Sequence, residues 1–148
     1  MNTLLVAVDF SDAMSAQLDG IRSLFAPGSV RLRLVHVLNP TPGYFGYGAF
    51  GGEWEVLTLD AQRESLEALL KTTCVGLASE GYEVDSAFLL GEPSTMLLQD
   101  ARGSGASVVV LGSHGHGAVS HLIMGSVATS VLRRAARPVL IIPAVKTD

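Results

Sequence analysis

Five short apolar runs alternate with longer segments of helical spacing along this 148-residue chain. The runs are rich in Val, Leu and Ile, and they are TLLVAV (3–8), VRLRLVHVL (30–38), VDSAFLL (84–90), ASVVVLG (106–112) and PVLIIP (138–143). Continuous apolar runs of this length are typical of strands that are buried on both faces of a parallel sheet. Because parallel strands need right-handed crossovers, helices should cover both faces. The sequence therefore predicts one α/β domain over 1–148, with a doubly wound, five-stranded parallel sheet.

Polar residues, glycine and proline mark the ends of the expected helices. Ser11 or Asp12 is expected to cap the first helix by accepting a hydrogen bond from a free backbone N–H. The other expected helices run from about Trp54 to Gly81, from Pro93 to Gly103-Ser104-Gly105, and from about Ser126 to Arg134. The segment NPTPGYFGYGAFGGE (39–53) has two prolines and five glycines, and its composition predicts a loop.

Composition excludes several classes of protein. Hydrophobic residues make up 48% of the chain and charged residues 16%, which is typical of a globular domain. The net charge is -4 and there is no basic run, so we expect no nucleic-acid partner. The N-terminus lacks the features of a signal peptide, and no apolar stretch approaches the ~20 residues of a membrane span. A cytoplasmic protein is expected, in which the one cysteine, Cys74, is a buried small hydrophobe.

The expected ligand site follows from the strand order. In doubly wound sheets, ligands bind beyond the carboxyl ends of the strands, at the point where the strand order reverses. Asp9 and Gly112 follow the first and fourth strands there. After Gly112 the chain holds glycines at 115, 117 and 125 before the next helix begins near Ser126. Glycines and a helix N-terminus can together cradle a phosphate, and Ser126 can cap the helix or donate its hydroxyl to the phosphate. A plain glycine-rich turn is the alternative, and a Walker A loop is excluded because the chain has no Gly-Lys-Ser/Thr.

The glycine spacing resembles a known family. Gly112-x2-Gly115-x9-Gly125-Ser126 matches, at every fixed position, the nucleotide-binding pattern G-x2-G-x9-G-(S/T) of the universal stress protein family. The resemblance covers nearly the whole chain, and its further segments are VAVDFSD (6–12), LVHV (34–37), GEP (91–93) and RPVLIIP (137–143). It implies a Rossmann-like five-stranded domain, a homodimer and, in the branch that carries this pattern, bound ATP.

The resemblance also implies roles for individual residues. Asp9 and Val37 resemble the family's adenine and ribose contacts, and the backbone of Ala7 and Val8 forms part of that pocket. The remaining expected contacts are to the ribose and the phosphates, and they are Gly112, Ser113, His114, Gly115, His116, Gly125, Ser126 and Val127. We expect Mg²⁺ to accompany the ATP. For Asp9 the alternative is a helix-capping carboxylate that does not touch the ligand.

Two histidines depart from the family pattern. The family often has Arg or Lys near the positions of His116 and His121. Histidine titrates near pH ~6.5, so at neutral pH these side chains are mostly uncharged. A neighbouring triphosphate would favour the charged form, and we therefore expect ATP affinity to increase as the pH falls.

Three functions remain open from the sequence. The first is an ATP-binding stress-response or signalling module with little or no turnover. The second is a slow ATP-hydrolysing enzyme, which lacks a recognisable pair of acid and base. The third is a metal-binding protein that uses His114, His116 and His121, although their spacing matches no standard zinc site. His36 is expected to be a core histidine.

The last apolar run predicts how the chain assembles. VLIIP is apolar on both faces and ends the sheet, so alone it would leave a row of unpaired backbone groups at an edge. Pairing with its twin about a two-fold axis would remove that edge. We expect a homodimer through the C-terminal strand.

Overall fold

The computed structural model describes residues 1–40, 53–113 and 124–144, with the backbone alone for 53–58. Five strands and four helices alternate in this part of the chain: β1 (Asn2–Ala7), α1 (Met14–Leu24), β2 (Val30–Leu38), α2 (Glu53–Ser79), β3 (Glu83–Leu90), α3 (Pro93–Ser104), β4 (Val108–Gly112), α4 (Ser126–Arg134) and β5 (Val139–Ile142). The strands form one parallel sheet in the order β3-β2-β1-β4-β5. The doubly wound α/β fold expected from the apolar runs is confirmed.

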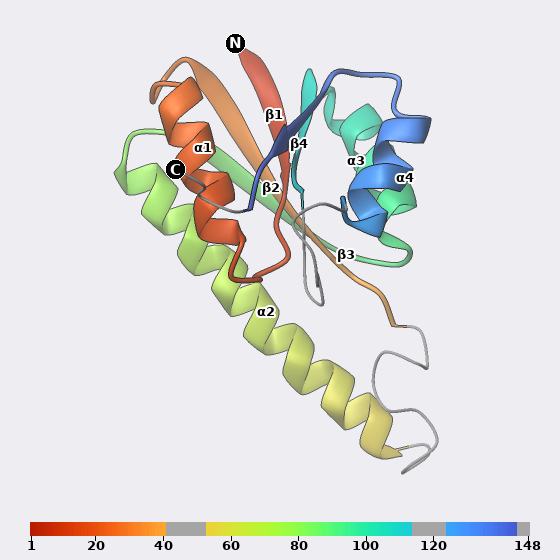
Figure 1. Cartoon of the computed structure of the whole chain (residues 1–148). Coiled ribbons are helices and arrows are strands. Elements are labelled where there is room, and N and C mark those ends of the chain that lie inside the picture. The colour runs from red at the N-terminus through yellow and green to blue at the C-terminus, as the bar shows by residue number, and fades with distance from the viewer. Residues whose placement is uncertain (41–52, 114–123, 145–148) are drawn as a thin grey trace.

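Helices cover both faces of the sheet, with α1 and α2 on one face and α3 and α4 on the other (Figure 1). Successive strand residues point to opposite faces, so each strand contributes to two cores. On the α1–α2 side the strand residues Leu4 and Val6 pack with Ile21 and Leu77. On the α3–α4 side the core holds Leu5, Val35, Val109, Leu97 and Val131. This division explains why the strands read as unbroken apolar runs.

Two helices end where the sequence predicts, on glycines with positive φ. Gly81 has a φ of 101° after α2, and Gly105 has a φ of 70° after α3. After α2 the N–H of Tyr82 donates to the carbonyl of Leu77 and that of Gly81 to Ala78, which is the Schellman arrangement. The Tyr82 hydroxyl then donates to the carbonyl of Phe25 at 2.7 Å, so the end of α2 is tied to the end of α1.

Three further expectations concern the loop 39–53, the burial of Cys74 and membrane-spanning segments. Most of the expected loop 39–53 lies outside the described residues, and Glu53 already begins α2. Cys74 is half-buried rather than buried, and burial raises the pKa of its thiol. Within the described ranges, no helix combines the length and the apolar character that a membrane crossing requires.

Candidate functional site

The ends of three neighbouring strands meet at one edge of the sheet. Val6 of β1 pairs with Leu34 of β2 on one side and with Val110 of β4 on the other. Toward the carboxyl ends of the strands, Asp9 lies three residues after Val6, Val37 three residues after Leu34, and Gly112 two residues after Val110. β1 and β4 are adjacent, and the chain leaves them in opposite directions along the sheet, toward β2 and toward β5. This is the crevice in which doubly wound sheets bind ligands.

A tight turn built on Asp9 follows β1. Its Oδ1 accepts hydrogen bonds from the Ser11 N–H at 3.0 Å and from the Ser11 hydroxyl at 2.7 Å. Phe10, between them, has a φ of 56°, which is uncommon for a residue with a side chain. The expectation that Ser11 or Asp12 caps the first helix is wrong, because α1 begins at Met14 and its N-cap, Ala13, makes no side-chain cap bond. Ser11 instead donates its N–H and its hydroxyl to Asp9 Oδ1, which places it in the turn that precedes the helix.

Ser113 brings the end of β4 and the start of α4 together. Its carbonyl accepts from the Gly125 N–H at 2.7 Å, although residues 114–124 separate the two in sequence. Its own N–H donates to the carbonyl of Ile142 at 3.0 Å, and its Oγ accepts from the Ala144 N–H at 3.1 Å. Ser113, which the sequence analysis expects as a ligand contact, therefore also joins the end of β4 to the start of α4 and to the end of β5.

The start of α4 is free of any side-chain cap in the part of the chain that the structure describes. Gly125 is the N-cap and makes no side-chain cap bond, and Ser126 is the first helical residue. The expectation that Ser126 caps this helix is therefore wrong, because the bond from Gly125 to Ser113 fixes the boundary one residue earlier. The first-turn N–H groups of a helix lack intrahelical partners and lie at the positive end of its dipole. Such a helix start can bind an anion through its backbone.

Two buried side chains support this edge from within the fold. Gln17 of α1 is 3% exposed, and its Nε2 lies 2.9 Å from the carbonyl of Ala7. The same Nε2 lies 3.5 Å from the carbonyl of Val110, so one amide spans the ends of β1 and β4. His36 is 7% exposed, and its Nδ1 lies 2.7 Å from the Val8 carbonyl, as befits the core histidine expected from the sequence.

Sequence reasoning missed Gln17, although a signal was present. The apolar stripe of α1 includes Met14, Leu18 and Ile21, and position 17 lies on the same helical face. A polar residue inside an apolar stripe is buried with a hydrogen-bond partner more often than it is left exposed. Here the partners are strand carbonyls at the place where the β1–β4 ladder ends.

A second network fastens α4 to α3. Glu92 is the N-cap of α3, and its carboxylate accepts hydrogen bonds from the backbone N–H groups of Thr95 and Ser94. Hydrogen bonds from Thr95 and Ser94 lower the pKa of Glu92 to about 2. Ser94 is 1% exposed, and from α4 both the Ser130 hydroxyl and the Arg134 guanidinium donate to its Oγ. Pro93 occupies the first turn, as expected.

The described members of the expected site belong to these strand ends and to the start of α4: Ala7, Val8, Asp9, Val37, Gly112, Ser113, Gly125, Ser126 and Val127. His114, Gly115, His116 and His121 lie outside the described residues. Among the residues that are described, no group of three His, Cys, Asp or Glu side chains is placed to hold a metal ion. The three histidines of the metal-binding alternative, His114, His116 and His121, are not among these residues.

Comparison with known proteins identifies the family. The profile of the universal stress protein family matches residues 1–143. The chain belongs to this family. A curated universal stress protein of Thermus aquaticus is 32% identical over 141 residues, which cover 95% of this chain and 97% of that protein.

Solved structures of universal stress proteins share the fold. The structure of protein MJ0577 of Methanocaldococcus jannaschii has a TM-score of 0.82 at 20% identity and covers 99% of this chain and 98% of that one. A universal stress protein of Archaeoglobus fulgidus, solved in complex with dAMP, has a TM-score of 0.59 at 21% identity, with 96% and 98% covered. Another universal stress protein, solved in complex with cAMP, has a TM-score of 0.59 at 17% identity, with 97% and 98% covered. Nucleotide binding thus occurs among the structural relatives of this protein.

Proposed function

We propose that this universal stress protein is an ATP-binding module of stress response or signalling, which acts in the cytoplasm as one nucleotide-binding domain over residues 1–148. ATP binds with Mg²⁺ and is turned over slowly or not at all. The adenosine lies against Ala7, Val8, Asp9 and Val37, and the phosphates lie in the 112–127 segment.

The uncapped start of α4 is the observation that carries this proposal. The Gly125 N–H donates to the Ser113 carbonyl at 2.7 Å, so the helix begins beside the end of β4, where Gly112 lies. Backbone N–H groups and the helix dipole then attract phosphates without any basic side chain. The structural relatives solved with dAMP and cAMP support an adenine nucleotide in particular.

A charge placed at the start of α4 tests the phosphate contact directly. Ser126→Asp puts a carboxylate beside the first-turn N–H groups, where it stabilises the helix but repels phosphate. Isothermal titration with Mg-ATP should show binding to the parent chain and at least about tenfold weaker binding to this variant. Ser15→Asp, in the first turn of α1, is the matched control and should leave the affinity unchanged. No heat from the parent chain, or equal affinity in Ser126→Asp, would refute the proposed site.

Loop variants and other nucleotides extend the same titration. Gly115→Val should weaken Mg-ATP binding strongly, because the backbone could no longer approach the phosphates closely. AMP, ADP and cAMP measured beside ATP separate the contribution of the adenosine from that of the outer phosphates. If AMP binds as tightly as ATP, the role assigned to the 112–127 segment is wrong.

Low turnover distinguishes a binding module from an enzyme. The chain shows no paired acid and base at recognisable spacing, so phosphate release at saturating Mg-ATP should stay well below the ~1–10³ s⁻¹ typical of enzymes. A rate within that range would favour the enzymatic alternative.

His116 provides a test of pH dependence. If it faces the phosphates, its pKa is higher in the complex than in the free protein, and affinity rises as the pH falls between those two values. The parent chain should bind Mg-ATP more tightly at about pH 6 than at about pH 8, while His116→Ala should show a flatter dependence after correction for the protonation of ATP itself. Parallel dependences would show that His116 does not contact the phosphates.

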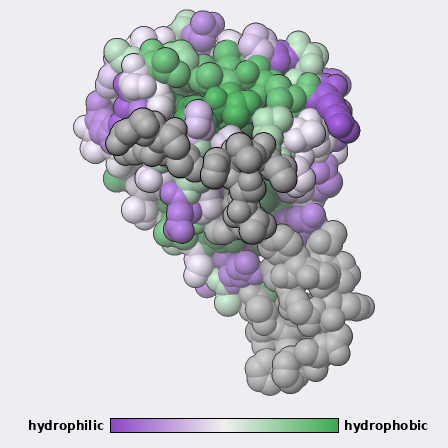
Figure 2. All heavy atoms as spheres, in the orientation of Figure 1, coloured by the Kyte–Doolittle hydropathy of each residue, from purple (hydrophilic) through white to green (hydrophobic). Residues whose placement is uncertain are grey.

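The homodimer remains part of the proposal. β5 is an edge strand next to β4, and its apolar residues Val139, Leu140 and Ile141 are only half-buried. Apolar side chains gather on the surface that β5 crosses (Figure 2). Pairing with a second copy would cover them and satisfy the edge. Light scattering should give twice the chain mass for the parent and a lower mass for Ile141→Lys; a parent with the mass of one chain would refute the dimer.

A further inference from the structure

The charges of this chain are unevenly distributed. Between Asp100 and Asp148 there is no Asp or Glu, while five Lys and Arg residues occur. Four of the five are arginines: Arg102, Arg133, Arg134 and Arg137. The protein is acidic as a whole, with a net charge of -4, so its C-terminal third is a basic region on an acidic molecule.

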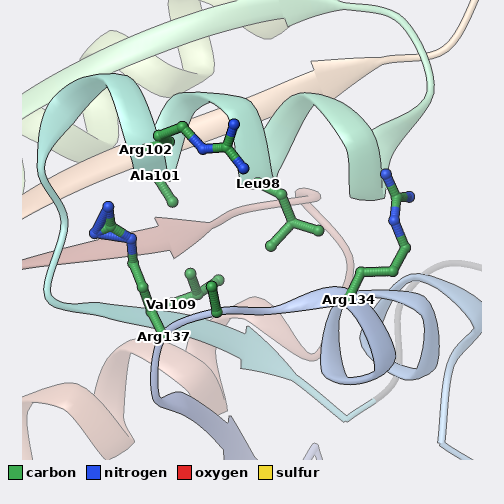
Figure 3. A pocket seen from close by; sticks show the side chains of 7 residues that line it. Leu98, Ala101, Arg102, Val109, Arg134 and Arg137 are labelled. Carbon is green, nitrogen blue, oxygen red and sulfur yellow. The ribbon is translucent and has the colours of Figure 1, made fainter.

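Three of these arginines surround a small hollow between α3, α4 and β4. Its volume is about 70 Å³, and its apolar lining consists of Leu98, Ala101, Val109 and Ala136. Arg102, Arg134 and Arg137 lie around this lining (Figure 3). They come from the last turn of α3, the last turn of α4 and the segment before β5, so the fold brings Arg102 close to two arginines that are distant from it in sequence.

The three arginines differ in what they already bind. Arg134 donates to Ser94 and Thr95 and lies 3.8 Å from the Glu92 carboxylate, so its guanidinium is engaged at the start of α3. The Nη1 of Arg137 donates a hydrogen bond to the Ala106 carbonyl at 2.5 Å. Its Nε and Nη2 donors remain available to a ligand. Within the described ranges neither Arg102 nor Arg137 has an acidic partner.

Most other arginines of the described residues do have an acidic partner. In the ion pairs of the first hundred residues, the guanidinium groups belong to Arg22, Arg31, Arg33 and Arg63. Arg102 stands in the last turn of a helix, where a cation also suits the helix dipole. Arg137 lies beyond α4, and its hydrogen bond to the Ala106 carbonyl uses only one of its donors. Two guanidinium groups with unused donors at the rim of one apolar hollow favour an anionic ligand.

The size of the hollow limits the anion. A cavity needs a volume of about 10–15 Å³ to hold one water molecule. The hollow, with about 70 Å³, therefore has room for on the order of five to seven non-hydrogen atoms. A phosphoryl group, with one phosphorus and its oxygens, fills that space. The apolar lining offers no hydrogen bonds, so the oxygens would take theirs from the two guanidinium groups, whose planar forks match phosphate geometry.

We propose that Arg102 and Arg137 form an anion site for a phosphoryl dianion, either inorganic phosphate or the phosphate group of a small monoester. The site lies at the C-terminal end of α4, whereas the proposed nucleotide site lies at its N-terminal end, about 12 Å away along the helix. The two sites use different residues, and this proposal stands whether or not ATP binds.

Residue-resolved NMR of the arginine side chains tests the proposal. Inorganic phosphate is titrated at constant ionic strength while the Nε–Hε signals of the ¹⁵N-labelled protein are followed. Saturable shifts are expected at Arg102 and Arg137 and not at Arg133, which stands in the last turn of α4 and does not line the hollow. Arg102→Gln should weaken phosphate binding about tenfold or more, and Arg133→Gln, the matched control, should not change it. Arg137→Gln should act like Arg102→Gln.

A second variant and a second ligand keep the test of the anion site informative. Arg102 makes no hydrogen bond or ion pair with the described residues that its loss would break, so Arg102→Gln remains informative if Arg137→Gln fails to fold. Phosphoserine titrated in parallel distinguishes a phosphate monoester from inorganic phosphate as the preferred ligand. Shifts that do not saturate, that match those caused by chloride, or that are equal at Arg133 would overturn the proposal.

Discussion

Replacing Gln17 by leucine tests the support beneath the candidate nucleotide site. Leucine has a similar size and suits the apolar stripe of α1, so the packing of the helix should survive. What is lost is the Nε2 donor, which lies 2.9 Å from the Ala7 carbonyl in a side chain only 3% exposed. A buried carbonyl left without its donor costs about 1–3 kcal/mol. The 3.5 Å approach to Val110 is too long to add a second full bond.

Urea unfolding gives the measurement. Gln17→Leu should lower the free energy of unfolding by about 1–3 kcal/mol, whereas Gln99→Leu, the same change on the exposed surface of α3, should stay within about 0.5 kcal/mol. Mg-ATP affinity should fall in Gln17→Leu as well, because Ala7 belongs to the proposed adenosine pocket. If Gln17→Leu is as stable as the parent chain, the amide does not hold the strand ends together and the reasoning fails.

Two further predictions concern the elements that frame the site. The pKa of Glu92 lies at about 2, below the ordinary 4.5, so the stabilisation from this cap is complete above about pH 4.5 and is lost as the pH falls toward 2. Glu92→Gln should therefore lower the free energy of unfolding by about 1 kcal/mol at pH 7, a value reduced for the exposure of the carboxylate, and by almost nothing near pH 2. If urea unfolding shows the same difference between parent and variant at both pH values, this prediction is wrong. Gly20→Ala would place a Cβ 2.8 Å from Ile142 Cγ2, so crowding of about 1–3 kcal/mol should exceed the helix gain of about 1 kcal/mol and lower Tm. Gly76→Ala has no atom within 4 Å of its Cβ and should raise Tm, so changes of the same sign in both variants would contradict the packing argument.

The sheet could be predicted because its strands are buried on both faces. Such strands need unbroken apolar runs, and the helices between them end on glycines such as Gly81 and Gly105, whose backbone requires positive φ. The strand order then follows from the connections, and with it the meeting of Asp9 and Gly112 at one edge. These inferences use local pattern and chain topology alone.

The errors at the helix starts have a different origin. Ser11 and Ser126 both have the chemistry of an N-cap, and composition cannot tell which backbone N–H each will meet. The choice is made by contacts that are distant in sequence or depend on a turn. Ser11 is taken by the Asp9 carboxylate, and the boundary of α4 is fixed by the bond between Gly125 and Ser113.

The arginine hollow could not be predicted for a related reason. Arg102 and Arg137 are far apart in sequence, and only Arg137 lies near other basic residues, Arg133 and Arg134. Only the crossing of α3 over α4 brings them to one apolar surface. The expectation that nucleic acid is not a partner rests on the absence of long basic runs, because a nucleic-acid groove needs many phosphate contacts. It carried no information about a site for a single phosphoryl group.

The position of α4 connects these observations to the proposed binding of phosphates. The affinity of a site made largely of backbone N–H groups depends on how firmly the helix is held before the ligand arrives. Ser113 accepts a hydrogen bond from Gly125, the N-cap of the helix, and Ser94 accepts hydrogen bonds from Ser130 and Arg134 further along it. Ordering α4 thus costs little on binding, because bonds to β4 and α3 have already ordered it.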